Sequence, residues 1–170
     1  MPEKPLPEPW LRGTHSEVPA VIRAALHALE LAGEDLRRWC GELTDEQLNR
    51  RPAQVASVAF HIRHIARSLD RLLTYAEGAS LNEAQMAALK SELAGGATRS
   101  ELFAELSASL ATSTARIRNF SHADLEAART VGRSLLPTTL GGVLVHIADH
   151  TQRHVGQAIT TAKIVLAQEL

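Results

Sequence analysis

Three histidines recur at every fourth position near the C-terminus, His146, His150 and His154, in a stretch with helical periodicity. A helix turns about 100° per residue, so residues four apart lie about 40° apart on one face. Two imidazoles placed in this way can bind one metal ion. A second helix-like run contains His61 and His64, and it offers the third nitrogen that an open metal site requires.

The apolar stripe of the C-terminal run ranks its three histidines. His154 lies inside the stripe, His150 at its edge and His146 farther out, which favours His150 and His154 as the pair. Gln157 lies beside His150 and could contact a ligand residue, while Gly156 leaves room for a bound molecule or a neighbouring helix. A pair of histidines at this spacing more often has a structural role than a metal-binding one. Helix bundles, however, assemble metal sites from residues on facing helices, so histidines on a second helix favour a metal site.

The stripe of the second run is less decisive. It has His61 on its flank and His64 farther round, so periodicity slightly prefers His61 and leaves both open. The same run carries Arg63, Arg67 and Arg71, which we expect on a solvated face unless they rim a pocket for an anionic substrate.

Composition narrows the class of protein. A chain of 170 residues with 45% hydrophobic content is long enough for one domain and short for two. The net charge of −1 without a basic block argues against nucleic-acid binding. The chain shows neither a membrane-length apolar run nor a signal-peptide pattern, so we expect a cytoplasmic protein. Its single cysteine, Cys40, allows no internal disulfide, and any metal must be held by nitrogen and oxygen ligands.

Helical periodicity and capping signals dominate the rest of the chain. Four prolines make residues 1–13 an extended arm, and residues 14–170 form one domain. His15, His27 and His122 have no partner at metal-ligand spacing. Ser16 is a candidate N-cap, and Thr44 and Thr98 begin capping boxes. The predicted long helices cover residues 16–40, 55–76, 98–119 and 138–168, with short pieces at 44–52 and 82–94.

The predicted fold class is all-α, a four-helix bundle with long crossover connections at 78–98 and 120–137. Within 120–137 we expect one turn and no further regular structure, because the segment lacks an apolar period.

Two motifs resemble a known family. His64-Ile65-Ala66, together with His150, His154 and the following Val-Gly-Gln157, is similar to the DinB/YfiT-like superfamily of metal-dependent enzymes, over nearly the whole chain. The resemblance implies a four-helix bundle that is often a homodimer. It also implies one divalent ion per subunit, zinc or nickel most often, held by His64, His150 and His154. His61, His146 and Gln157 are then alternate ligands or residues that contact the ligands.

Three neutral imidazoles leave at least one metal position open, which is the arrangement of a catalytic site. The resemblance implies an S-transferase that uses a low-molecular-weight thiol, such as bacillithiol or mycothiol, on a small-molecule substrate. A metal-activated hydroxide would instead make the site a hydrolase. A fourth protein ligand would favour a non-catalytic metal-binding stress or dimerisation protein.

Overall fold

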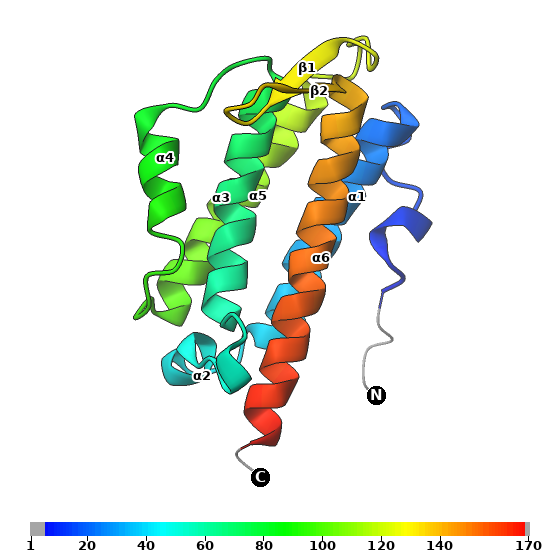
Figure 1. Ribbon diagram of the computed structural model, residues 1–170. Helices are drawn as coiled ribbons and strands as arrows, with labels where there is room; N and C mark the ends of the chain where they lie inside the picture. The colour runs from blue at the N-terminus through cyan, green and yellow to red at the C-terminus, as the bar shows by residue number, and fades with distance from the viewer. Residues whose placement is uncertain (1–5, 169–170) are drawn as a thin grey trace.

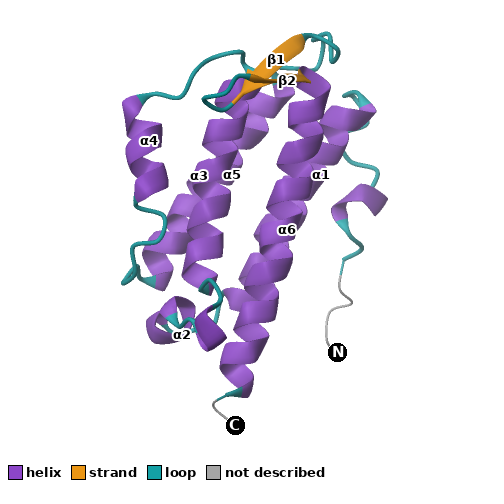
Figure 2. Ribbon diagram, in the orientation of Figure 1, coloured by secondary structure: helices purple, strands orange, loops and turns teal. Residues whose placement is uncertain are grey.

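The structure, a computed structural model, describes residues 6–168 as four long helices with shorter elements around them (Figures 1 and 2). The long helices are α1 (Ala20–Cys40), α3 (Val58–Ala76), α5 (Arg99–Arg118) and α6 (Leu140–Ala167). The shorter elements are α2 (Asp45–Asn49), α4 (Glu83–Lys90), 3₁₀ turns at Pro9–Leu11 and Pro52–Gln54, and strands β1 (Ala128–Val131) and β2 (Leu136–Thr139). The predicted all-α four-helix bundle is confirmed.

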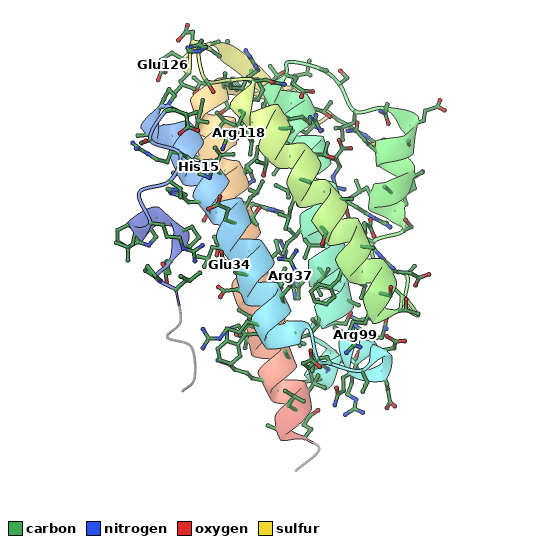
Figure 3. All side chains as sticks on the ribbon, turned by 180° about the vertical axis from the view of Figure 1, so that it is seen from behind. His15, Glu34, Arg37, Arg99, Arg118 and Glu126 are labelled. Atoms are coloured by element: carbon green, nitrogen blue, oxygen red, sulfur yellow. The ribbon has the colours of Figure 1, made fainter. Side chains whose placement is uncertain are left out.

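The packing order of the helices differs from their order in the chain. α6 packs against α1 and α3, and α5 packs against the same two helices from the other side, so α1 and α3 are diagonal. Seen from behind, α1 and α5 lie side by side (Figure 3). α3 and α5 run in the same direction, and the segment between them returns along the outside of α3 through α4 (Figure 1). This return is the crossover predicted for residues 78–98.

The second predicted crossover contains regular structure that the sequence did not indicate. β1 and β2 form an antiparallel hairpin, with Ala128 paired to Thr139 and Val131 to Leu136. Gly132 and Leu135 in its turn adopt positive φ values of 75° and 49°. The connection joins the diagonal helices α5 and α6 at one end of the bundle and does not run along its length (Figure 1).

Polar caps explain where most helices begin. The side chains of Thr44, Ser57, Asn82, Thr98 and Thr139 each accept a hydrogen bond from the backbone N–H three residues later. Each bond satisfies one of the N–H groups that a helix start leaves unpaired. The capping boxes predicted at Thr44 and Thr98 are confirmed.

The first helix begins later than predicted. α1 starts at Ala20 after an extended Pro19, so Ser16 is not its N-cap. His15 has a φ of 57°, a left-handed conformation that a helix cannot include. The described part of the predicted arm, residues 6–13, contains a 3₁₀ turn, and Arg12 ties it to Glu34 of α1 with contacts of 2.6 and 2.7 Å. Residues 1–5 of that arm lie outside the described part.

The core consists of aliphatic side chains from all four long helices. Burying each such side chain contributes about 1.5–3 kcal/mol relative to leaving it exposed. Among the described helices, none combines the length and the apolar character needed to cross a membrane. The largest fully buried side chains are Ile22, Leu26, Leu29, Leu36, Leu48, Ile62, Ile65, Leu69, Leu73, Leu102, Leu106 and Ile117.

Candidate metal centre

Three histidines from two facing helices converge between α3 and α6. His64 of α3 and His150 and His154 of α6 each offer a ring nitrogen, and the three nitrogens lie within 4.8 Å of one another. The Nε2 atoms of His64 and His150 are 3.3 Å apart. All three side chains are half-buried. The structure therefore brings together the residues that the resemblance assigned to a metal.

Hydrogen bonds on the far side of His64 decide which of its nitrogens is free. Its Nδ1 lies 2.7 Å from Oε2 of Glu92, and Oε1 of the same carboxylate accepts from Arg71 at 2.5 Å. A carboxylate accepts hydrogen bonds, so the proton of a neutral His64 is on Nδ1 and the lone pair is on Nε2. This pairing of carboxylate and histidine is the usual support of a metal-binding imidazole.

Glu92 is a site residue that the sequence did not indicate. It follows α4 in the chain, is 4% exposed and reaches the cluster from outside the four long helices. Burial acts to raise its pKa, but hydrogen bonds from His64 and Arg71 outweigh burial and hold the pKa below its usual range. Glu92 is therefore a buried anion between two donors.

The hydrogen-bond partner of His150 favours the same tautomer as that of His64. Its Nδ1 lies 3.5 Å from Oγ of Ser68, a long contact. The Ser68 hydroxyl donates to the carbonyl of Ile65 at 3.2 Å, so toward His150 its oxygen can only accept. A neutral His150 that donates from Nδ1 to Ser68 presents its lone pair on Nε2.

When both rings are neutral in these tautomers, the Nε2 lone pairs of His64 and His150 face each other across 3.3 Å. Facing lone pairs repel unless a cation lies between them. Two imidazoles bound to one tetrahedral zinc at about 2.0–2.1 Å have nitrogens about 3.3–3.4 Å apart. The observed separation and polarity fit a divalent ion.

His61 contacts a clustered histidine but is not itself in the converging group. It is 5% exposed, and its Nδ1 lies 3.1 Å from Nδ1 of His154. Ligation through Nε2 of His154 requires the proton on Nδ1, which then donates to His61. The helical stripe was right that His61 points inward. Both histidines reach α6, His61 through His154 alone, but only His64 places a nitrogen in the group that converges with both His150 and His154.

His146 and Gln157 lie outside the cluster. His146 is exposed, with its ring centroid 5.4 Å from that of His150, and it is not among the residues whose nitrogens converge. Gln157 is exposed and lines a cavity together with His61. Neither residue contacts the clustered nitrogens through a hydrogen bond among those of the described residues.

Two histidines of the cluster, His150 and His154, and the adjacent His61 are held in the neutral form that a metal needs. Burial, with a further contribution from the neighbouring His64, lowers the pKa of His61 and of His150 to about 4 and that of His154 to about 3. At pH 7 these imidazoles are therefore neutral, and a metal ion does not have to displace a proton from them in order to bind.

The arginines of α3 are not on a solvated face. Arg67 lies 2.6 Å from Glu105 of α5, Arg71 contacts Glu92, and Arg63 donates to a backbone carbonyl of the segment after α4. The expectation of a solvated face was wrong, because α4 and α5 cover this side of α3. Their charges are engaged within the protein.

A second group lies where α1 meets the N-terminal segment. Ring nitrogens of His15 and His27 and a carboxylate oxygen of Glu30 are within 4.8 Å of one another, a proximity that the sequence spacing did not indicate. However, Nδ1 of His15 accepts from Arg118 at 2.7 Å, so Nε2 carries the proton and donates to Glu30 at 2.6 Å. Figure 3 shows His15 and Arg118 close together on this side. No lone pair of His15 is free, and the group fastens the segment to α1 and α5.

Comparison with known families agrees with the geometry. The sequence model of the DinB superfamily matches residues 28–158, which is most of the chain and includes all three clustered histidines and Glu92. No curated protein sequence matches this chain. The chain belongs to the DinB superfamily.

Proposed function

We propose that this protein is a metal-dependent enzyme that holds one divalent ion per subunit at His64, His150 and His154. The observation that carries the proposal is the pair of Nε2 atoms of His64 and His150, which lie 3.3 Å apart while a partner faces the opposite nitrogen of each ring. Imidazole nitrogens suit zinc and nickel, and three protein ligands leave a position for an exogenous ligand.

The surroundings of the cluster argue against a closed, non-catalytic site. The Glu92 carboxylate is engaged by His64 and Arg71, so a fourth protein ligand would have to come from a nearby histidine. His61 is engaged with His154 at 3.1 Å, and the ring of His146 stays outside the converging group. The fourth position is therefore left to water, a thiol or a substrate.

The reaction we propose is the transfer of a low-molecular-weight thiol to a small electrophile. A divalent ion at the three imidazoles would lower the pKa of a thiol entering the open position. Glu92, the carboxylate that contacts the cluster, is committed to His64 and Arg71 and so is not available as a general base for a metal-bound water. This commitment favours a thiol over water as the nucleophile.

The thiol must come from outside the chain. Cys40, the single cysteine, is buried, and burial raises its pKa to about 12. The arginines of α3 are engaged by carboxylates and backbone carbonyls, so they support the bundle and do not attract an anionic thiol. The residues that act on the thiol are in this proposal the three clustered histidines.

The test is a thiol titration of cobalt-substituted protein. We expect about one metal ion per subunit and, on adding 2-mercaptoethanol, a sulfur-to-cobalt charge-transfer band in the near ultraviolet. Ethylene glycol is the matched control without sulfur. His146→Ala should keep the ion and the band, and His64→Ala should lose both.

Absence of bound metal after incubation with excess zinc, nickel or cobalt would overturn the proposal as a whole. Retention of the ion with no thiol band at saturation would overturn the transferase reaction alone, and would favour the hydrolase.

A further inference from the structure

A cavity of about 520 Å³ lies beside the metal centre, between the start of α3 and the C-terminal half of α6. Val55 and Ile164 supply apolar walls, while His61, Arg153 and Gln157 supply polar groups. None of the three clustered histidines lines it. The link between the two places is His61, which lines the cavity and contacts His154 through Nδ1 at 3.1 Å.

Gly156 keeps this cavity open. A glycine in a helix interior costs about 1 kcal/mol relative to alanine, so its presence in the middle of α6 calls for a reason. Close packing is not the reason, because a Cβ built at Gly156 meets no described atom within 4 Å. Gly156 is exposed, and the open space that a side chain would occupy adjoins the cavity that Gly156 lines.

Arg153, Gln157 and His61 offer hydrogen-bond donors to the cavity, beside the acceptor oxygens of Gln157 and of the lining Thr160 and Thr161. Arg153 has five N–H groups and uses one of its nitrogens for Asp149 at 2.5 Å, which leaves donors free. Gln157 adds an amide, and His61, whose Nδ1 is engaged, has Nε2 left. Among the described residues that line the cavity, none is acidic. Donors at an apolar cavity of this size select a ligand with an acceptor or anionic group.

We propose that this cavity binds a small carboxylate with an apolar body. The guanidinium of Arg153 pairs with the carboxylate, and the hydrocarbon part lies over Gly156 between Val55 and Ile164. The site goes beyond the proposed function and does not rest on it, because its lining residues do not include the histidines of the metal centre. A ligand here touches His61 and so lies one hydrogen bond from His154.

The test is calorimetric binding of hexanoate to full-length protein, with and without a chelator. We expect binding under both conditions, whereas 1-hexanol and hexylamine, which lack the carboxylate, should bind at least about tenfold more weakly. Gly156→Leu should fill the cavity and raise the dissociation constant of hexanoate at least about tenfold. Its melting temperature should stay equal or rise, since leucine is the better helix former.

Arg153→Gln should weaken hexanoate about three- to tenfold and leave 1-hexanol unchanged, as expected for the loss of one charge-assisted bond at an exposed site. Arg133→Gln, in the turn of the hairpin, is the matched control and should bind like the wild type.

Three results would overturn the proposal: no binding of hexanoate, equal binding of hexylamine, or unchanged binding to Gly156→Leu. If the wild type is a dimer that binds no hexanoate, and Gly156→Leu dissociates it, the cavity is a contact between two copies of the chain and the ligand site is wrong. Loss of metal binding alone would leave hexanoate binding intact, so the failure of the proposed function is seen separately.

Discussion

Replacing Glu92 by glutamine tests how the metal centre is supported. The carboxylate accepts from His64 at 2.7 Å and from Arg71 at 2.5 Å and is 4% exposed. Glutamine has the same shape but only one oxygen. If its amide nitrogen faces Arg71, two donors meet in a buried place. If it faces His64, the imidazole must move its proton to Nε2 and lose the lone pair that would bind metal.

Either arrangement weakens metal binding. Loss of a residue that holds a metal-binding histidine costs about 10–100-fold in affinity, which is about 1.4–2.7 kcal/mol. We therefore expect the zinc dissociation constant of Glu92→Gln to rise by that factor, measured at pH 7.5 by competition with a chromophoric chelator. The direct loss of a ligand, as in His64→Ala, should be more severe.

Glu105→Gln is the matched control. Glu105 of α5 pairs with Arg67 of α3 at 2.6 Å, but its side chain is 34% exposed, and Glu105 is not in the converging histidine group. Its zinc affinity should stay within about twofold of the wild type, because an exposed ion pair contributes only about 0–1 kcal/mol. If Glu92→Gln also stays within that range, the argument from the tautomer of His64 is refuted. If both variants weaken zinc equally, general loosening of α3 is the cause.

Two further predictions concern the histidines. Chelator-competition measurements should show that replacing His150 or His154 by alanine abolishes tight zinc binding. Replacing His146, which is exposed and outside the cluster, should change zinc affinity little. Equal losses of zinc affinity in all three variants would refute the assignment of the ligands. In the folded protein the pKa of His61 and of His150 is about 4 and that of His154 is about 3, whereas the ordinary value is about 6.5. The unfolded chain therefore binds more protons than the folded chain as the pH falls from about 6.5 to 4. Urea unfolding of metal-free protein should therefore show a lower free energy of unfolding at pH 5 than at pH 7, with on the order of 2 kcal/mol from His61 alone; a flat profile would contradict it.

Local chemistry made the helices predictable. The caps at Thr44 and Thr98 are properties of a few adjacent residues, and the structure has them where the sequence placed them. The hairpin was not predictable in this way. Its strands are four residues each and include Pro137, so their pairing depends on the ends of α5 and α6 being held at a fixed distance.

The site could be predicted from the sequence only where its residues recur at helical spacing. The spacing of His150 and His154 placed both on one face, but the choice between His61 and His64 needed the position of α6 relative to α3. No sequence pattern indicated that Glu92 belongs to the site. It lies 28 residues from His64 in the chain, and in sequence it is an ordinary acidic residue at the end of a short helix.

The topology explains why a residue so distant in the chain supports the metal centre. Parallel packing of α3 and α5 requires the chain to return along the bundle, and the return passes over the outward face of α3 through α4 (Figure 1). Covering that face buries Arg71, which is 8% exposed, and a buried guanidinium needs an anion. Glu92 at the end of the return provides this anion, and its second oxygen reaches His64. The crossover that completes the fold thus also fixes the proton on one histidine of the cluster.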